Sequence, residues 1–362
     1  MAAPHTTRRS TRDGAWAVAS VLAISALALL TSGPRHSPIH AQTPSSPGRV
    51  DVLSSVSGLS PGIVGRFREP AGFERVPGGP YYVFDRRGHA VHTVAADGSD
   101  FRTLVEIGGE EGRLLEPSAF DVAPDGSFAV ADAPGGRERI QVFGAAGLRI
   151  GGFGRPGRAP ARVAIGSLVL SGVGSLVYTG TSIVLSEPDS GWLLTEYGTR
   201  GAILRSMGTL RSTGQEADRE VHLALNAGLA LPEPGGGFYF VFLAGAPAFR
   251  RYGPSGDLVY ERAIQGRELD PVVAALPQRW PRRRVEDRET PLVLPTVRTA
   301  AVDPAGRLWV SFVVPYTYVF DADGEKVRTV QFRAAGIVAP SSLSFVAPNR
   351  VLVTPGCYEF LF

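Results

Sequence analysis

Histidines that could bind a metal are few in this sequence. His89 and His92 are three residues apart and could begin a metal site. On a β-strand, however, residues three apart point to opposite faces of the sheet. No cysteine or third histidine lies close by to complete a ligand set. Beyond residue 41 the only other histidine is His222, so we predict surface or sheet-face histidines and no metal.

Three aspartates could hold calcium if a repeating fold brought them together. Asp85 and Asp132 each follow an apolar run, whereas Asp303 comes just before a Pro-Ala-Gly turn. The alternative is that each carboxylate accepts hydrogen bonds from turn amides, which is the commoner role of aspartate at such positions. We favour the turn role for all three.

Nucleophilic catalysis has little support in the sequence. No Gly-x-Ser-x-Gly motif lies between a strand and a helix, since Gly166-Ser167 and Gly174-Ser175 have hairpin-like surroundings. Residues 235–237 are three glycines that precede a strand, unlike a phosphate loop. The single cysteine, Cys357, stands in an apolar stretch and is predicted to be a small core residue. We therefore predict no catalytic residue, no metal and no cofactor.

The segment 278–289, QRWPRRRVEDRE, is the most distinctive surface candidate. Trp280, Arg282, Arg283 and Arg284 could grip an anionic or carbohydrate ligand through charge and stacking. The alternative is a solvated loop whose arginines pair with Glu286, Asp287 and Glu289. Loops on a rigid scaffold often carry binding sites, so these four residues are the predicted binding site.

The N-terminal residues resemble an export signal. Three arginines within residues 8–12 precede an apolar run of sixteen residues, Ala15–Leu30, and a small residue at Ala41 offers a cleavage point. We predict a signal peptide over 1–41, or an anchor if it stays uncleaved, and a flexible linker over 42–48. The protein is then periplasmic or extracellular, and contacts membrane only through an uncleaved residue 15–30 segment.

The basic character of the chain belongs to this leader. The whole chain has 37 basic and 34 acidic residues, and residues 1–41 hold four arginines against one aspartate. The remainder is neutral, with 33 of each sign. A neutral chain gives no reason to expect nucleic acid as a partner.

The elements that must position these residues are short strands that recur in units. In residues 117–154 a strand ends at Val122, Pro124-Asp125-Gly126 turns the chain, and three more strands follow, at 128–131, 140–143 and 148–153. Residues 299–332 repeat this order. Four further units have similar first turns, and the six turns, at 78, 125, 173, 235, 305 and 348, are 47, 48, 62, 70 and 43 residues apart.

This period predicts an all-β fold: a six-bladed β-propeller of four-stranded antiparallel blades over residues 49–362, behind an N-terminal signal helix. The two long spacings predict insertions near 209–224 and 265–297. The last unit runs out one strand short, so we expect Val50–Leu53 to supply its outer strand and close the ring.

Residues 117–154 resemble an NHL repeat, a family of β-propeller blades. The resemblance rests on Pro124-Asp125-Gly126, Val130-Ala131-Asp132, Arg139–Phe143 and Phe153-Gly154, and residues 295–324 share part of it. It implies six blades and leaves the activity open, because the fold hosts binding proteins, scaffolds and a few enzymes. Propeller lyases of similar fold use several histidines, and propeller lactonases use a Glu, Asn and Asp metal set. This chain has few histidines and only Asn226 and Asn349.

Two functions remain open at this point. The first is an exported, non-catalytic, monomeric propeller that binds a partner protein or small ligand through its loop face. The alternative is a propeller enzyme, a lyase or hydrolase, with a metal in the central channel. The repeat pattern and the lack of a catalytic motif favour binding.

Overall fold

The computed structural model describes residues 40–41, 49–156, 161–165, 168–171, 175–285, 288–347 and 349–362. The predicted signal helix and the linker at 42–48 lie outside these residues. The chain divides into Met1–His36 and Ser37–Phe362, and the account below concerns the second part. The fold of its described residues is all-β, as predicted, with three short α-helices. None of the described helices is long and apolar enough to cross a membrane.

Four sheets follow one another along the chain, and each contains four consecutive antiparallel strands. Their strands, from the innermost outward, have the following bounds: β3 Pro70–Arg75, β4 Tyr81–Asp85, β5 Ala90–Val94 and β6 Phe101–Val105; β7 Ala119–Val122, β8 Phe128–Asp132, β9 Arg139–Phe143 and β10 Arg149–Gly154; β13 Leu176–Tyr178, β14 Ser182–Ser186, β15 Trp192–Gly198 and β16 Ile203–Thr209; β17 Gly228–Pro232, β18 Phe238–Phe242, β19 Ala248–Tyr252 and β20 Leu258–Ala263.

The rest of the chain completes the sheet system. A larger sheet joins two groups of strands through β2 (Val50–Gly58): β23 Val297–Val302, β24 Leu308–Phe312, β25 Thr317–Phe320 and β26 Lys326–Arg333; and β28 Ser342–Ala347, β29 Arg350–Thr354 and β30 Tyr358–Leu361. Smaller elements are β1 (His40–Ala41), the hairpins β11 (Ala161–Ile165) with β12 (Leu168–Ser171) and β21 (Arg282–Val285) with β22 (Arg288–Pro291), β27 (Ile337–Val338), and the helices α1 (Pro61–Val64), α2 (Arg219–Leu225) and α3 (Asp270–Ala274). Two 3-10 turns are η1 (Pro134–Gly136) and η2 (Pro188–Ser190).

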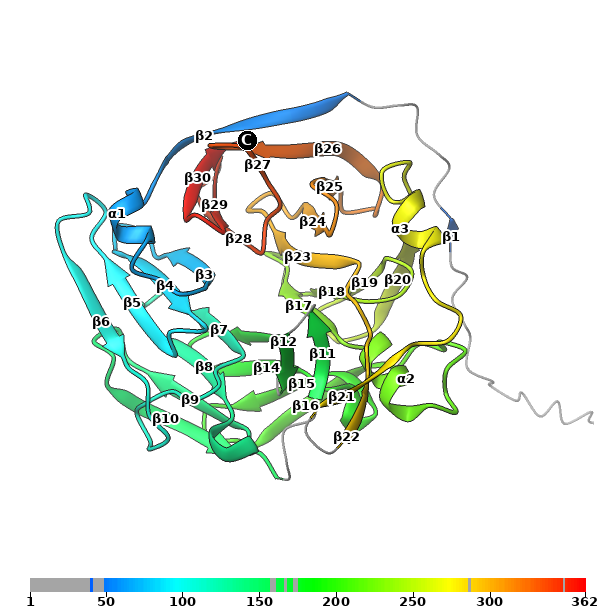
Figure 1. Ribbon diagram of the computed structural model, residues 1–362, viewed down its shortest axis with the longest axis horizontal. Coiled ribbons are helices and arrows are strands. Elements are labelled where there is room, and N and C mark those ends of the chain that lie inside the picture. Colours follow the sequence, from blue (N-terminus) through cyan, green and yellow to red (C-terminus); the bar gives the residue numbers. More distant parts are fainter. Residues whose placement is uncertain are drawn as a thin grey trace, which may run out of the picture. The chain divides into compact units, whose positions relative to one another are not determined.

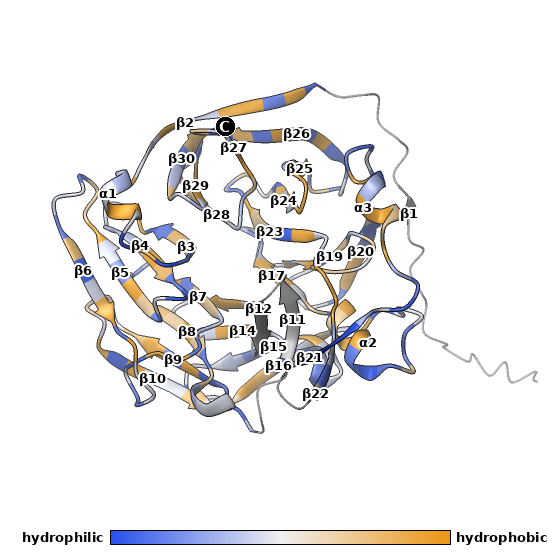
Figure 2. Ribbon diagram, in the orientation of Figure 1, coloured by the Kyte–Doolittle hydropathy of each residue, from blue (hydrophilic) through white to orange (hydrophobic). Residues whose placement is uncertain are grey.

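In five of the groups the second strand is buried along its whole length. These strands are β4, β8, β14, β18 and β24. Such strands read as unbroken apolar runs because both faces of the sheet pack on neighbours. In the hydropathy colouring, apolar stretches recur on strands around the ring (Figure 2). Six core clusters of the described residues each join two successive groups. One of them contains Phe84, Val91, Phe128 and Phe143.

The sheets follow each other around a common axis (Figure 1). The innermost strands are in contact in chain order: β3 with β7, β7 with β13, β13 with β17, β17 with β23, and β23 with β28. The last contact returns to the start, because β28 also contacts β3. This closed circuit of sheets is a propeller-like arrangement.

The strand β2 closes the circuit, but in a different register from the sequence prediction. Val50–Ser54 pairs in parallel with β26, and only the continuation Ser55–Gly58 pairs with β30 of the last group. The run Val50–Leu53, which was expected to complete the last group, therefore pairs with β26 of the preceding group. A single nine-residue strand that bends past a register shift between Ser55 and Ser57 serves both outer edges.

The third group also differs from the prediction, by one strand. The sequence places its first turn at Gly172–Gly174, outside the described residues, and takes Leu176–Tyr178 as the strand that follows. In the structure Leu176–Tyr178 is the innermost strand β13, and the turn after it is Thr179–Thr181. The hairpin β11–β12 is inserted ahead of β13. Its apolar runs follow the same order as the first strands of a group, so the sequence comparison of the units took it for the start of the third group.

The antiparallel order of the strands gives the ring two unlike faces. Two kinds of loop lie on one face, which we call the connection face. They are the connections from one group to the next, and the turns from the second to the third strand within a group. All described helices and 3-10 turns lie there, as do the insertions 210–227 and 264–296. The opposite turn face has only the remaining turns, each of six residues or fewer. Asp125-Gly126 is one of them, with Gly126 at a left-handed φ of 82° that glycine accepts without strain.

Candidate functional site

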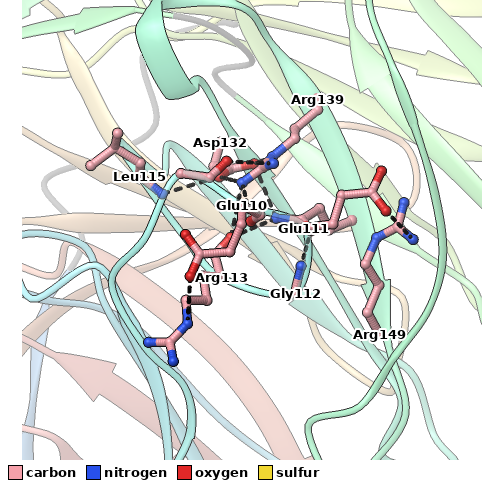
Figure 3. Close-up of polar contacts among 10 residues, drawn as sticks. Glu110, Glu111, Gly112, Arg113, Leu115, Asp132, Arg139 and Arg149 are labelled. Atoms are coloured by element: carbon pink, nitrogen blue, oxygen red, sulfur yellow. Dashed lines mark hydrogen bonds and ion pairs between the residues drawn. The ribbon is translucent and has the colours of Figure 1, made fainter.

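Asp132, at the end of β8, organises a loop on the connection face (Figure 3). Its carboxylate is fully buried and accepts two hydrogen bonds from Arg139, at 2.8 and 2.9 Å, and one from the amide of Leu115 at 3.1 Å. Arg139 also donates to the carbonyls of Gly109, Glu110 and Arg113. The predicted turn role of Asp132 is confirmed, because its carboxylate accepts a hydrogen bond from the amide of Leu115.

Gln141 completes the same network. It donates to the carbonyl of Arg113 and accepts from the amide of Gly112, both at 2.8 Å. The loop 109–115 is thus held by three side chains of the repeat motif: Asp132, Arg139 and Gln141. The loop displays Glu110 and Glu111, which pair with Arg113 and Arg149 (Figure 3).

Asp85 and Asp303 also bind turn amides, as predicted. Asp85 accepts from the amides of Arg68, Glu69 and Gly88 at 2.7 to 3.0 Å. Asp303 accepts from the amides of Ala305 and Arg307, and from the indole of Trp309 at 3.0 Å. The three aspartates serve three separate turns and do not form one site.

The predicted binding segment lies in an insertion module, by which we mean residues 210–227 and 264–296 together. Arg282, on β21, donates to Asp218 at 2.6 Å and to Glu220 at 2.9 Å. Trp280 is partly buried against the small core formed by α2, Ala244 and Val293. Arg283 and Arg284 are exposed on the hairpin, which appears as a hydrophilic ribbon in Figure 2. The alternative partners Glu286 and Asp287 lie outside the described residues.

Arg211 fastens this module to the sheets. Its guanidinium stacks over Phe242, 3.8 Å from the ring centroid, and donates to the carbonyls of Leu225 and Ala244. Burial lowers the pKa of Arg211 to about 10, so it stays charged at neutral pH. Asn226 is buried beside it and accepts from the amide of Arg211 at 2.8 Å. Asn226 is therefore a structural residue of the module.

A carboxyl pair that the sequence analysis missed lies on adjacent innermost strands. Glu74 on β3 accepts from the amide of Val122 on β7 at 3.2 Å, and Asp121 on β7 accepts from the amide of Tyr178 on β13 at 2.6 Å. An innermost strand is a sheet edge whose open amides need acceptors. Each carboxyl thus supplies an acceptor to the next strand around the axis.

The two carboxyls also interact with each other. Desolvation, and then the charge of Asp121, raise the pKa of Glu74 well above its usual range. Desolvation raises the pKa of Asp121 to about 7, against the lowering effect of the Tyr178 amide. A carboxyl that holds a proton near neutral pH can act as a general acid or base. The signal for this pair was the equal position of Glu74 and Asp121, one residue before the end of the first strand, in successive units.

The histidines and the cysteine considered in the sequence analysis belong neither to the insertion module nor to the Glu74–Asp121 pair, except for His222, which lies in the module on α2. His89 lies in the β4–β5 turn, while His92 lies on β5 against the rings of Phe67 and Phe101. Cys357 is fully buried, as predicted, and burial raises the pKa of its thiol to about 12. His222, on α2, contacts the hydroxyl of Thr213 at 2.8 Å. Within the described ranges no three His, Cys, Asp or Glu residues gather as a metal site.

No family model matches this chain, and a search of curated proteins found no match. Among solved structures, a virginiamycin B lyase from Staphylococcus aureus has a TM-score of 0.50 at 10% identity, covering 81% of this chain and 93% of that one. This likeness concerns the fold alone. The fold is that of a β-propeller.

Two other solved structures are less similar. A streptogramin B lyase has a TM-score of 0.49 at 10% identity, covering 85% of this chain and 96% of its own. A protein of unknown function from Bacteroides caccae has a TM-score of 0.45 at 12% identity, covering 72% and 81%.

Proposed function

We propose that this chain is an exported, six-bladed propeller of the NHL type that binds a partner protein or small ligand through its connection face. The observation that carries the proposal is the contrast between the two faces. All described helices and both long insertions lie on the connection face, and the turn face has only short turns. Rigid scaffolds display binding loops in this way. The closed circuit of innermost strands, β3 to β28 and back, supports the count of six blades.

The insertion module is the proposed centre of binding. Arg282 is engaged with Asp218 and Glu220, so its role is to hold the hairpin. Arg283 and Arg284 are exposed beside it and are the proposed contacts, with Trp280 as a partly buried support.

The test is capture of partners from an envelope extract of the native source by the tagged full chain. We expect R283A and R284A together to lose a partner that the parent captures. The matched control is R102A, an exposed arginine on β6 that pairs with Asp100. Equal capture by the parent and by the double variant would refute the module as the binding centre.

Export is proposed from the sequence of the leader. Cleavage after Ala41 would leave Gln42 as the first residue and remove β1, which pairs with β20. N-terminal sequencing of the protein from a periplasmic fraction should therefore read from Gln42. Recovery of the intact chain in the membrane fraction would instead support the anchor, and a cytoplasmic chain would refute both.

Acid–base catalysis is a second candidate, because of the Glu74–Asp121 pair. A catalytic carboxyl must be reachable by a small molecule. A water-soluble carbodiimide with an amine, which couples to protonated carboxyls, should label Asp121 at pH 7 if the pair is accessible. Absence of label on both residues, with the D121N variant as the blank, would reject a catalytic role.

A further inference from the structure

The connection-face end of the first group has polar side chains whose hydrogen bonds are incomplete. Glu69 leads into β3, while Arg86 and His89 lie in the turn between β4 and β5. Oε2 of Glu69, Nε of Arg86 and Nδ1 of His89 are buried, and within the described residues none of these atoms has a hydrogen-bond partner. Buried polar atoms in native proteins nearly all have partners, so three exceptions in one place indicate a bound group that the chain itself does not supply.

The corresponding place in the second group lacks this polar cluster. The amide of Arg86 donates to the carbonyl of Glu69 at 3.0 Å. In the second group the amide of Ala133 donates to the carbonyl of Leu115 in the same way, also at 3.0 Å. Apolar side chains therefore occupy the two positions there. The Glu69–Arg86 pair is an addition to the first group and is not required by the repeat.

The charges of this cluster favour an anion. The Asp85 carboxylate beneath the turn is already engaged by three backbone amides. Glu69 shares its single carboxylate between Arg86 and Arg87. Arg68 is exposed, and its guanidinium forms no ion pair or hydrogen bond within the described part of the chain. Three guanidiniums thus stand against two carboxylates, which leaves a positive surplus.

The backbone of His89 is a separate observation. Its φ of 52° lies in the left-handed region, which is uncommon for a residue with a side chain and costs glycine nothing. Strained residues of this kind cluster at functional sites, where the side chain is needed at that position. The strain at His89 places a buried ring nitrogen in the same turn as Arg86.

We propose that Arg86 and His89, with Arg68 beside them, bind the oxyanion group of a small ligand, either a carboxylate or a phosphate. The side chains of Arg86 and Glu69 are 20% and 28% exposed, so a ligand can reach the pair from the surface. Its oxyanion would replace Glu69 on Arg86 and accept hydrogen bonds from the guanidinium and from the protonated Nδ1 of His89. The charge of Arg68 would attract it.

This site gives a ligand class to the proposed function. It rests on the proposed use of the connection face for binding but not on the insertion module. The capture experiment with R283A and R284A and the experiment below can therefore fail independently.

The experiment adds inorganic phosphate or acetate to the full chain at constant ionic strength. Calorimetry measures the affinity, and NMR of isotopically labelled histidine follows the ring signal of His89, which H89G identifies by its loss. We expect saturable binding that shifts this signal, whereas sodium chloride should not shift it. The tighter of the two anions indicates the ligand class.

The variants of the ion pair should change affinity in opposite directions. R86Q should weaken binding about tenfold, because a charge-assisted hydrogen bond is lost. E69Q should strengthen binding, because it removes the carboxylate that competes for Arg86. The control is R137A, which removes an exposed arginine from the corresponding turn of the second group. Equal weakening by R137A and R86Q would show attraction to general surface charge and overturn the proposal, as would the absence of saturable binding in both the parent and E69Q.

H89G tests the alternative that His89 serves only the turn. Glycine suits the left-handed φ, so H89G should keep or raise Tm. On the proposed role it should nevertheless weaken anion binding. An H89G protein that binds phosphate and acetate as tightly as the parent would overturn the assignment of His89 to the site.

Discussion

At the scale of single residues, the carboxyl pair beside the axis should make stability depend on pH. The pKa of Asp121 in the fold is about 7, and that of Glu74 is also raised, so the folded chain binds more protons than the unfolded chain above about pH 4. Stability then falls as pH rises through this window, by up to about 1.4 kcal/mol per pH unit for each proton. D121N removes one carboxyl, and with it the charge that raises the pKa of Glu74. It should therefore flatten the dependence of stability on pH between pH 4 and 7. Urea denaturation at several pH values measures it.

The control for this prediction is Asp97, in an exposed turn. Hydrogen bonds from the hydroxyl and amide of Ser99 lower the pKa of Asp97. Its contribution to stability is therefore present at high pH and lost only as pH falls below the usual aspartate range. D97N should leave the slope between pH 4 and 7 unchanged. A parent protein whose stability is constant over this window would contradict the assigned pair.

Single residues were predictable where their role is local. Asp85, Asp132 and Asp303 bind amides of turns close to them in sequence or held by the same repeat, and turn chemistry predicts that. Glu74 and Asp121 depend on the next strand around the axis, and nothing within either unit shows that their carboxyls interact. The arginine of the predicted binding segment was also partly misread, because the acids that Arg282 pairs with come from the other insertion.

At the scale of elements, the buried Asp132–Arg139 pair should control the order of the loop 109–115. D132N keeps the shape of the side chain but leaves Arg139, which is 15% exposed, without its carboxylate. Breaking such a pair costs about 3 kcal/mol. We expect that loss in urea denaturation, together with faster amide exchange at Gly112 and Leu115. E110Q, at the exposed tip, should cost about 0.5 kcal/mol or less; an equal cost for both variants would show that burial is not the cause.

The hairpin β21–β22 should depend on Arg282 in a similar way. R282A removes both ion pairs to the α2 segment, so amide exchange within Arg282–Pro291 should accelerate while the sheets keep their protection. High salt should produce the same acceleration in the parent, since exposed ion pairs are screened. R279A, in the same exposed segment but ahead of the hairpin, is the control. Unchanged exchange in R282A would mean that Trp280 packing alone holds the hairpin.

At the scale of the whole molecule, the sequence predicted the repeat but only approximately how the ring closes. The recurring turn-and-strand units were visible because each unit needs the same apolar second strand and the same tight turn. The register of closure was not predictable, because β2 is mostly polar and exposed and only Leu53 is buried. The hairpin β11–β12 shifted the third unit because it imitates the apolar order of a blade.

The closing strand gives the last prediction, since β2 holds two outer edges at once. Its Ser57 hydroxyl donates to buried Glu359 at 2.8 Å, and Tyr81 donates to the same carboxylate at 3.2 Å, so the last sheet is tied to the first. Removal of residues 1–58 should therefore leave β26 and β30 uncovered and open this seam. We expect Tm to fall by on the order of 10 °C, because the free energy of unfolding should decrease by several kcal/mol. Removal of residues 1–48 keeps β2 and should leave Tm unchanged; equal Tm values for the two truncations would mean that the ring is held by its core clusters alone.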